Sequence, residues 1–486
     1  MRIVVCMKRT ASGELNPFDA CAYEAALQIP DSEVILLSMG PAKTEEMLSN
    51  LTRLGAQGAY LLCDSVFAGA DTLATAYVLS LAIKKLSPDL VICGRQTIDG
   101  DTAQTGPSLS VAAGLSLITN VMRIKNTEGS LVCETRDLGT QMVDYPALIT
   151  VERINHLRLP SIRSKKGIVI RWTAKDIGAD ENRCGMKGSP TKVLASFQNE
   201  EGKRKCKFIE AAEIQDAIKQ GLEKEKQRLK PMKASTMKLQ KVWIVGEAPK
   251  TFAESISDDI TVIHKADFTN DDGNYREFVE RFVEYIKERK PEVILWGSDA
   301  WSKAVAPQVA ALLQTGLCAD CTALETDGEK LFMYRPAFSG NIVAKIVCIT
   351  KPQMATVRTL ETDSADIICA LGKGAKHVVR DIQAIVQQKN DLADKDNGPR
   401  WDIAASRLAV DAEMLPYDKQ IGITGKSVNP PVYIAVGISG AVHHISGMKQ
   451  SGIVIAINSD KKAPIFDYSD YGIVGNIEDI LEGEWL

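Results

Sequence analysis

Two stretches of the chain, at an offset of 203 residues, are similar to each other. Residues 87–94 (SPDLVICG) and 290–297 (KPEVILWG) each place a proline and an acidic residue before four apolar residues and a glycine. Residues 146–152 (PALITVE) and 352–358 (PQMATVR) repeat the relationship at nearly the same spacing, so the similarity extends beyond one motif. The chain therefore contains a diverged duplication, and any fold proposed for it must be built twice.

Continuous apolar runs alternate with amphipathic segments in the chain. Residues 34–39, for example, form an apolar run, and residues 44–54 follow with helical spacing. Strands that are apolar throughout, alternating with helices, are typical of a parallel sheet covered on both faces. We expect an α/β fold with two pseudo-symmetric doubly wound parallel-sheet domains, followed by a third unit that runs to the C-terminus.

Length and composition fit this organisation. The chain has 486 residues, which suits roughly three domains of ~150 residues each. The 58 basic residues against 62 acidic ones give a net charge of -4, so no basic excess favours nucleic acid as a partner. No run of ~18 apolar residues predicts a membrane-spanning segment, and the opening MRIVVCMKRT is not typical of a secretory signal. We expect a cytoplasmic protein without membrane insertion.

Changes in composition divide the chain into four parts. We expect domains over residues 1–197 and 240–365, which correspond to the two copies, and a third over residues 366–486. Residues 198–239 between the copies are rich in Lys, Glu and Gln and predict a charged helical arm or linker. Such a helix is usually a solvated connector, although one that leaves its domain could wrap across a neighbouring domain.

The eleven cysteines predict reduced thiols rather than a disulfide framework or a metal centre. They are scattered singly, mostly through apolar runs, apart from Cys318 and Cys321. That pair has the CxxC spacing of a zinc site, but the five histidines supply no second ligand pair at a matching spacing. We therefore predict no metal site.

A glycine-containing loop joins a buried strand to a helix in the first copy. Glycines allow backbone amides to approach a ligand, and hydroxyls and a helix start suit phosphate. The loop lies at the carboxyl edge of the predicted sheet, where α/β proteins bind nucleotides; the alternative is a well-capped helix without a ligand. The equivalent loop of the second copy, residues 297–303, lacks the second and third glycines. The candidate nucleotide-binding residues are Gly94, Asp99, Gly100, Asp101, Thr102, Ala103, Gln104 and Gly106.

The densest group of polar residues lies in the last unit. Hydroxyls flanked by glycine, one cation and paired histidines border its apolar strands, and such groups suit a large, polyhydroxylated and phosphorylated ligand. Two enzymatic motifs fail here, because Gln420 stands where a P-loop needs glycine and Ala441 where a nucleophile elbow needs it. Adjacent His443 and His444 point about 100° apart on a helix and cannot both bind one metal ion. The group comprises residues 406–407, 422–426, 437–444 and 457–460.

At these residues the chain resembles an electron-transfer flavoprotein whose beta subunit is fused ahead of its alpha subunit. The beta-like part ends near residue 200, and the alpha-like part begins near residue 240. The resemblance implies that two pseudo-symmetric domains carry a mobile, Rossmann-like FAD-binding domain. The motifs that carry the resemblance are residues 16–18 (NPF), 38–41 (SMGP) and 94–107 in the first part, and residues 319–322 (ADCT), 335–338 (RPAF) and 352–358 in the second.

The resemblance also implies roles for residues of the last domain. Ser406 and Arg407 match the family's Ser-Arg pair, whose guanidinium lies over the flavin ring and favours its anionic reduced forms. Thr424 matches the threonine that bonds flavin N5, and His444 matches the histidine near flavin O2. Further FAD-binding residues implied by the resemblance are Gly425, Ser439, Gly440, Asn458 and Asp460.

The first domain distinguishes two branches of the family. Ordinary members hold AMP there, whereas electron-bifurcating members hold a second FAD that accepts a hydride from NADH. Residues 99–107 (DGDTAQTGP) resemble the bifurcating version, in which the small Gly100, Thr102 and Ala103 leave room for the larger cofactor. We expect two FADs, with NAD(H) as a candidate substrate. One FAD with a structural AMP is the alternative.

The resemblance implies an electron carrier between an acyl-CoA dehydrogenase-type flavoprotein and an acceptor such as ferredoxin, flavodoxin or a membrane quinone oxidoreductase. Residues 156–162 (HLRLPSI) resemble the beta-subunit loop whose leucine enters a pocket of the dehydrogenase, so Leu159 is the predicted docking residue. The alternative is that Leu159 packs against its own domain. A non-redox nucleotide-binding sensor would need only the loop 94–107, and an ATP-using ligase of similar fold would need an N-terminal phosphate loop that this sequence lacks.

Overall fold

The computed structural model forms two compact units. One unit comprises residues 1–197 with most of 232–359, and the other comprises residues 198–231 with 360–486. The described residues are 1–152, 156–198, 203–228, 235, 237–269, 275–337, 342–357, 365–396, 398–422, 426 and 428–481.

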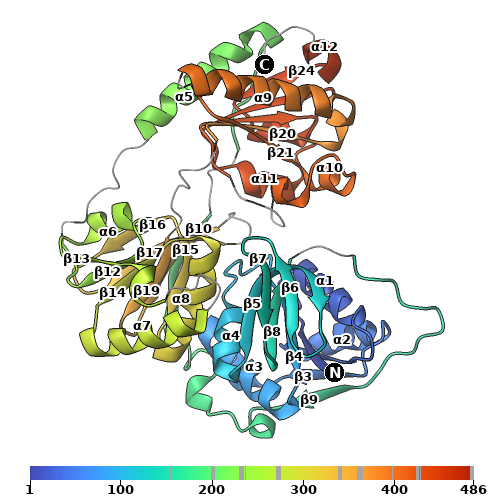
Figure 1. The fold of residues 1–486 in the computed structure, drawn as a ribbon, viewed down its shortest axis with the longest axis vertical. Coiled ribbons are helices and arrows are strands. Elements are labelled where there is room, and N and C mark those ends of the chain that lie inside the picture. The colour runs from blue at the N-terminus through green and yellow to red at the C-terminus, as the bar shows by residue number, and fades with distance from the viewer. Residues whose placement is uncertain are drawn as a thin grey trace. The chain divides into compact units, whose positions relative to one another are not determined.

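The first copy is built on a nine-stranded sheet in the order β7-β6-β5-β8-β4-β1-β2-β3-β9 (Figure 1). Neighbours from β5 to β9 are parallel, and β6 and β7 add antiparallel strands at one edge. The strands are β1 (Arg2–Cys6), β2 (Glu33–Met39), β3 (Gly58–Leu62), β4 (Leu90–Gly94), β5 (Ser116–Asn126), β6 (Leu131–Thr135), β7 (Gly139–Val143), β8 (Ala147–Val151) and β9 (Val169–Trp172). The helices are α1 (Pro17–Leu27), α2 (Thr44–Thr52), α3 (Thr72–Leu86) and α4 (Thr105–Ala113).

The second copy has a five-stranded parallel sheet in the order β13-β12-β14-β19-β15 and a four-stranded sheet in the order β10-β18-β17-β16. The strands are β10 (Thr191–Gln198), β12 (Val242–Val245), β13 (Ile260–Ile263), β14 (Val293–Trp296), β15 (Leu317–Cys321), β16 (Ala323–Thr326), β17 (Leu331–Ala337), β18 (Ile342–Cys348) and β19 (Gln353–Val357). The helices are α6 (Lys250–Ile256), α7 (Tyr275–Arg289) and α8 (Ala300–Leu313).

The central strands of both copies have the same order, β5-β8-β4-β1-β2 in the first and β15-β19-β14-β12-β13 in the second. The likeness extends to backbone detail. Asn120 and Asp320 have φ values of 55° and 52°. Their N–H groups donate to the hydroxyls of Thr150 and Thr356, at 3.0 and 2.8 Å. The predicted α/β fold with duplicated parallel-sheet domains is confirmed.

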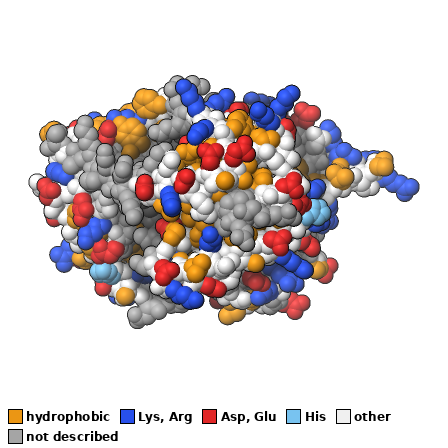
Figure 2. Space-filling model, turned by 90° about the horizontal axis from the view of Figure 1, so that it is seen from above, with side chains coloured by type: hydrophobic (Ala, Val, Ile, Leu, Met, Phe, Trp, Pro, Cys, Tyr) orange, Lys and Arg blue, Asp and Glu red, His pale blue; other side chains and the backbone are white. Residues whose placement is uncertain are grey.

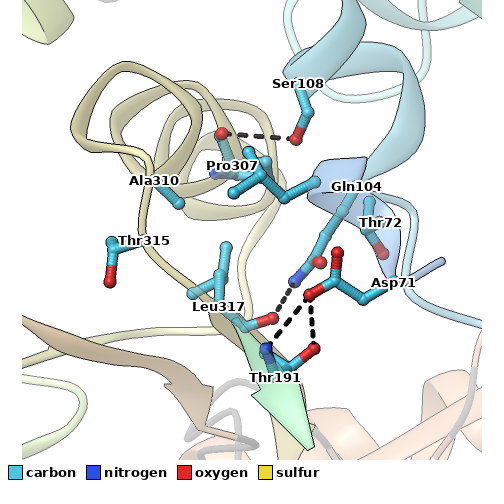
Figure 3. A pocket seen from close by; sticks show the side chains of 10 residues that line it. Asp71, Thr72, Gln104, Ser108, Thr191, Pro307, Ala310, Thr315 and Leu317 are labelled. Atoms are coloured by element: carbon cyan, nitrogen blue, oxygen red, sulfur yellow. Dashed lines mark hydrogen bonds between the residues drawn. The ribbon is translucent and has the colours of Figure 1, made fainter. Parts of the chain in front are cut away.

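The two copies share one core within their unit. Helices α4 and α8 pack against each other, and one cluster of buried side chains extends from Val4 in the first copy to Trp296 in the second. A cavity of about 20 Å³ lies at this junction, near the hydrogen bond of 3.3 Å that the Ser108 hydroxyl donates to the Pro307 carbonyl (Figure 3). A cavity of that size holds about one water molecule. It is therefore too small for a nucleotide.

The C-terminal unit is a six-stranded parallel sheet in the order β11-β24-β23-β22-β20-β21. The strands are β11 (Lys207–Phe208), β20 (Ile367–Leu371), β21 (Trp401–Ala405), β22 (Val432–Val436), β23 (Ile453–Asn458) and β24 (Tyr471–Val474). The helices are α5 (Ile214–Arg228), α9 (Val379–Asp396), α10 (Arg407–Asp411), α11 (Val442–Met448) and α12 (Ile477–Leu481).

The segment between the two copies contributes to this C-terminal sheet. β11 extends one edge by pairing in parallel with β24. Helix α5, green in Figure 1, packs on β22 and β23 and buries Ile214 and Ile218. The Arg204 guanidinium donates to the Gly452 carbonyl at 2.9 Å and so holds the start of the segment. Residues 203–228 therefore belong structurally to the C-terminal unit.

The described residues form a surface on which charges of both signs are mixed (Figure 2), and several of their cysteines lie in the interior. Acidic and basic side chains are interspersed on the face seen in Figure 2, in keeping with the net charge of -4. None of the eleven cysteines, all of which lie among the described residues, forms a disulfide, and Cys318 and Cys321 lie buried in β15. Among the described residues, no helix is both long enough and apolar enough to span a bilayer.

Candidate nucleotide-binding sites

Two central strands of the C-terminal sheet mark the edge where a ligand is expected. The chain passes from β20 to β21 on one side and then to β22 on the other, so β20 and β22 form the switch point of this sheet. Open α/β sheets bind ligands outside the carboxyl ends of strands at such a point. Gly372, after β20, lies so close to the carbonyl of Gly437, after β22, that a side chain at Gly372 would not fit. The two turns therefore meet at the switch point.

Ser406 and Arg407 lie directly after β21. The Ser406 N–H donates to the Leu371 carbonyl at 2.8 Å, which fixes the start of α10 beside the end of β20. The Arg407 side chain is 39% exposed, and its Nε lies 3.4 Å from a carboxylate oxygen of Asp411. The guanidinium is therefore a partly solvated cation at the carboxyl edge of the sheet.

The turns after β22 and β23 are joined by polar contacts. Asn458 Nδ2 donates to the Ile438 carbonyl at 2.9 Å, and the Asp460 N–H donates to Asn458 Oδ1 at 2.9 Å. Gly440 has a φ of 91°, which favours glycine, and the side chain of Ser439 is exposed. The Asn458 amide thus shapes the turn, and Ser439 presents its hydroxyl to the surroundings.

His444, in α11, is almost completely buried. Its Nε2 lies 2.9 Å from the hydroxyl of Tyr433, whereas its Nδ1 has no hydrogen-bond partner among the described residues. Burial lowers the pKa of His444 to about 4, and the backbone of Ile421 offsets this only in part. The ring is therefore neutral near pH 7 and carries an unsatisfied polar atom, a feature that points to a missing ligand.

The structure brings most of the predicted residues of this unit to one edge. Ser406 and Arg407 follow β21, Ser439 follows β22, and Asn458 and Asp460 lie at or just after the end of β23, all at the carboxyl edge of the sheet. Thr424 and Gly425 lie outside the described residues. Their contacts with a flavin stay predictions.

In the first copy, two glycines shape the loop between β4 and α4. A side chain at Gly94 would lie 2.7 Å from the backbone of Phe18, so α1 approaches this strand end only because glycine is there. A side chain at Gly106 would lie 2.5 Å from the Thr150 methyl group. Both glycines therefore allow close packing of the loop against α1 and β8.

Asp99 is held by a cation in this loop. Lys8 Nζ donates to Asp99 Oδ1 at 2.7 Å, and the Gly100 N–H donates to the same oxygen at 2.7 Å. Burial alone would raise the pKa of Asp99, but the hydrogen bond and charge of Lys8 outweigh it and lower the pKa below its ordinary value. Asp99 is therefore ionised at neutral pH and fixes the loop.

The next residues have an unusual backbone. Asp101 and Ala103 have φ values of 50° and 53°, in the left-handed region that residues with a Cβ rarely adopt. Gln96 Nε2 holds Asp101 by donating to its Oδ1 at 2.6 Å. Burial, together with the negative charge of Asp320, raises the pKa of Asp101. Thr102 and Ala103 are half-buried.

Arg335, on β17 of the second copy, also holds this loop, and sequence reasoning missed it. Its Nη2 donates to the carbonyls of Gly100 and Asp101 at 2.9 and 3.2 Å, and the residue is 7% exposed. In the opposite direction, Gln104 Nε2 donates to the Leu317 carbonyl at 3.3 Å. A local pattern does not link residues so far apart in sequence. A cation within a largely apolar strand was the available signal.

Helices α4 and α8 occupy equivalent positions but begin differently. Asp299 caps α8, because its Oδ1 accepts the Ser302 N–H at 2.9 Å. Gln104 precedes α4, and its side chain makes no capping bond. The first N–H groups of a helix need partners outside the helix, and anions supply them well. The start of α4 is therefore the better of the two positions for a phosphate.

A buried carboxyl lies below the same loop. The Lys8 N–H donates to Asp19 Oδ2 at 2.7 Å, and burial raises the pKa of Asp19 to about 7 despite this bond and one with Asn16. The contact ties the start of α1 to the end of β1. The protonation state of Asp19 therefore affects the contact between Lys8 and α1, which lies beside the loop between β4 and α4.

Comparison with known proteins assigns the family. Residues 3–177 and 242–383 match the family described as Electron transfer flavoprotein domain, and residues 361–449 match the Electron transfer flavoprotein FAD-binding domain. The chain belongs to the electron transfer flavoprotein family. The first match spans both copies of the duplicated domain, and the second spans β20 to α11.

Relatives of two kinds resemble this electron transfer flavoprotein. The Electron transfer flavoprotein subunit alpha of Thermoanaerobacterium thermosaccharolyticum is 38% identical over 243 residues, which is 42% of this chain and 73% of the relative. The subunit beta of the same organism is 39% identical over 194 residues, 37% of this chain and 75% of the relative. The Acryloyl-CoA reductase electron transfer subunit beta of Anaerotignum propionicum is 33% identical over 274 residues, 42% of this chain and 73% of the relative. The length of the chain fits a fusion of a beta and an alpha subunit.

The C-terminal unit of the flavoprotein fits FAD. The family match identifies an FAD-binding domain there. The structure contributes a switch point, the cation of Arg407, and the buried Nδ1 of His444, which no described residue satisfies. These are groups that can receive a large anionic cofactor with acceptor atoms on its ring.

The segment with the predicted docking residue projects from its unit, at the right of Figures 1 and 2. Leu159 is 90% exposed, and Ile162 is 99% exposed. Next to Leu159, the Arg158 guanidinium donates to the buried carboxylate of Glu24 at 2.7 Å, which anchors the segment on α1. The exposure leaves Leu159 free of packing with its own domain, and its docking role stays a prediction.

Proposed function

We propose that this flavoprotein carries electrons between an acyl-CoA dehydrogenase-type flavoprotein and a redox acceptor, through FAD held at the carboxyl edge of the C-terminal sheet. FAD, when bound, accepts and donates the electrons. The observation that carries the proposal is the buried Nδ1 of His444, which has no hydrogen-bond partner in the part of the chain that the structure describes. The acceptor is a ferredoxin, a flavodoxin or a membrane quinone oxidoreductase.

The chain's own residues tune such a cofactor through charge and hydrogen bonding. Arg407 is a cation that stabilises negative charge on the reduced ring. Ser406 and Ser439 offer hydroxyls, and the resemblance assigns Thr424 to flavin N5 and Gly425 to the same cofactor. Asn458 and Asp460 shape the edge assigned to the adenosine end. His444 supplies a neutral ring where the flavin carbonyl is expected.

A second nucleotide is proposed in the first copy, and we favour FAD over AMP there. Support comes from the uncapped start of α4, the cations Lys8 and Arg335 around the loop, and the small residues Gly100 and Ala103. With FAD at this position, NADH is the candidate hydride donor and electron bifurcation the candidate activity. Similarity to the Acryloyl-CoA reductase electron transfer subunit beta of Anaerotignum propionicum favours a CoA-ester oxidoreductase as partner.

Cofactor analysis tests both parts of the proposal. The purified chain is saturated with FAD, freed of excess ligand and denatured, and FAD and AMP are quantified per chain. Two FADs with little AMP support the favoured reading. One FAD with stoichiometric AMP places the protein among ordinary carriers, and failure to bind any FAD overturns the electron-carrier function.

Replacing Arg407 by Ala tests the position of the C-terminal flavin. Two unit charges ~4 Å apart interact by roughly 1 kcal/mol in water and roughly 4 kcal/mol at an effective dielectric of ~20. Because Arg407 is partly solvated, the lower value is the better guide. The midpoint potential of the bound FAD should become more negative. An unchanged redox titration with FAD still bound would remove Arg407 from the flavin.

A further inference from the structure

Tyr433 and His444 form a buried hydrogen bond in the C-terminal unit. The polar groups around this pair determine which nitrogen of the His444 ring carries the hydrogen. Tyr433 is the second residue of β22, and its side chain is completely buried. His444 is the third residue of α11 and is 5% exposed. The Tyr433 hydroxyl and His444 Nε2 lie 2.9 Å apart, a normal hydrogen-bond length. A buried contact of this kind holds the ring in one orientation.

The imidazole carries only one hydrogen. Burial lowers the pKa of His444 to about 4 and raises the pKa of Tyr433 well above its ordinary value, so both groups are neutral near pH 7. In a neutral imidazole, one nitrogen donates and the other accepts. The identity of the donor therefore depends on which partner supplies the hydrogen between Tyr433 and Nε2.

The two possible arrangements differ in how many polar groups they satisfy. If the Tyr433 hydroxyl donates to Nε2, its hydrogen is satisfied, the ring hydrogen is on Nδ1, and only Nδ1–H lacks a partner among the described residues. If Nε2–H donates to the Tyr433 oxygen, both the buried hydroxyl hydrogen and the bare Nδ1 lack a partner among the described residues. Buried donors without an acceptor are costly.

We propose that Tyr433 is a positioning residue that holds His444 in the tautomer with its hydrogen on Nδ1, so that the ring presents a donor to FAD. The proposal rests on the proposed function, since FAD is the ligand assigned to this unit. Nδ1 is the buried atom without a partner among the described residues. A donor there pairs with a carbonyl oxygen or ring nitrogen of the flavin, whereas a bare nitrogen would repel it. Tyr433 thus acts on the cofactor through His444.

The first test reads the tautomer without using the cofactor. The full-length chain, labelled with 15N in its histidines and freed of FAD, is examined by long-range 15N–1H NMR. A His444→Asn variant identifies the His444 signals among the five histidines. We expect a protonated Nδ1 and an unprotonated Nε2. A protonated Nε2 in the unmodified chain would overturn the proposal.

A pair of tyrosine variants shows whether Tyr433 selects the tautomer. Tyr433→Phe should give a mixture of the two tautomers at His444. Tyr471→Phe is the matched control, because the Tyr471 hydroxyl lies on β24 of the same sheet and bonds Gln220 at 2.7 Å. The control should leave His444 unchanged. A Tyr433→Phe spectrum identical to that of the control would overturn the proposal.

A double-mutant cycle tests the link to FAD. Loss of one hydrogen bond corresponds to about a three- to tenfold change in an equilibrium constant. Tyr433→Phe should therefore raise the dissociation constant of FAD by about that factor. In a His444→Ala background the same change should have no further effect. An equal effect in both backgrounds would mean that Tyr433 acts on folding or on FAD directly and would overturn the proposal.

Failure of the proposed function gives a different result. If the unmodified chain binds no FAD, the electron-carrier function is wrong. The NMR test of the tautomer can still be interpreted in that case, because it is made without FAD. Thermal unfolding of each variant separates loss of fold from loss of the tautomer. Tyr433→Phe keeps the ring and removes only the hydroxyl, so the variant is expected to fold.

Discussion

The loops that follow β4 and β14 start from equivalent strands of the two copies, but they differ in length and in the residues that hold them. After β4, residues 95–104 form a long loop that is held by Lys8 on one side and by Arg335 on the other. After β14, the chain reaches Asp299 within three residues and turns directly into α8. One helix start is left open, and the other is closed by its own side chain.

The duplicated sheet alone therefore does not provide a phosphate-binding site, because the two copies share it and differ at the helix start. The central strands of both copies have the same order, and Asn120 in β5 and Asp320 in β15 are both left-handed. What differs is the chemistry at the helix start, where capping by Asp299 satisfies the amides that a phosphate would otherwise bind. The second copy instead supplies Arg335 to the loop of the first. Duplication thus permits one copy to support the site of the other.

The largest expected effect comes from equivalent glycines. At Gly94 a new methyl group would lie within 3 Å of the Asp19 carboxylate and the backbone of Phe18, whereas at Gly297 the one atom within 3 Å would be a carboxylate oxygen of Asp299. Gly94→Ala should therefore cost ~1 to 3 kcal/mol of the free energy of unfolding, and Gly297→Ala clearly less. Urea unfolding of both variants measures the difference. Equal losses would show that the two strand ends are packed alike.

The next effect concerns the helix starts. Gln104→Asp would place an anionic cap on α4, which competes with a phosphate for the N–H groups and repels it. We expect nucleotide affinity in the first copy to fall about tenfold, or ~1.4 kcal/mol, as measured by calorimetry with AMP and FAD. Gln104→Ala is the control, because it removes the Leu317 contact without adding charge.

The reciprocal change belongs to the same comparison. Asp299→Ala removes the cap of α8 and should cost ~1 kcal/mol of stability without changing nucleotide content. If uncapping α8 creates nucleotide binding in the second copy, or if Gln104→Asp binds AMP and FAD unchanged, the helix start is not what distinguishes the copies.

A smaller effect is expected in the pH dependence of stability. The folded-state pKa of Asp19, about 7, lies above its ordinary value of 3.8, so the folded state binds more protons than the unfolded state between these values. The contribution of Asp19 is full at acidic pH and is lost as pH rises through about 7. Asp19→Asn should therefore reduce the fall in unfolding free energy from pH 4 to pH 8.

Asp99 is a control, because its pKa is shifted in the opposite direction from that of Asp19. Its pKa is lowered in the folded state, so its contribution is present above its ordinary pKa and is lost as pH falls. Asp99→Asn should weaken the protein at neutral pH and leave the decline toward pH 8 in place. Parallel stability curves for the unmodified chain and Asp19→Asn would contradict the prediction.

The smallest effect on stability is expected at Leu159. Because the side chain is 90% exposed, Leu159→Ala should leave the melting temperature and FAD content unchanged. Electron transfer with the partner dehydrogenase should fall several-fold if the leucine fills a pocket there. Ile162→Ala, at an equally exposed position, is the matched control. Full transfer by the Leu159 variant at limiting protein concentration would remove this residue from the docking surface.

Local patterns were sufficient for the fold because the strands of a parallel sheet are continuous apolar runs. Residues 90–94 and 293–296 could be recognised as related strands from their pattern and spacing, and both are strands of parallel sheets in the structure. The glycines of the nucleotide loop were also visible, although Gly94 proves to be needed for packing against Phe18. The sequence shows that position 94 has no side chain, but it does not show that the backbone of Phe18 occupies the space where a side chain would be.

Contacts between distant residues could not be predicted in this way. Arg335 reaches the Gly100 carbonyl because two copies of the domain share a core, and that arrangement depends on tertiary packing. The same holds for β11, whose two residues pair with β24 although nothing in Lys207 or Phe208 indicates a partner. The Tyr433–His444 bond requires a strand and a helix to pack face to face.

The pairing of β11 with β24, and of α5 with the same sheet, has a consequence for how such a protein is assembled. Residues 203–228 precede the second copy in sequence but complete the C-terminal sheet. If the chain were divided near residue 240, this segment would become a contact between two molecules, and its formation would depend on their concentrations. In the continuous chain the same contact is intramolecular, at an effective concentration set by the intervening chain. Fusion therefore fixes the stoichiometry of the two halves at one to one, at any dilution.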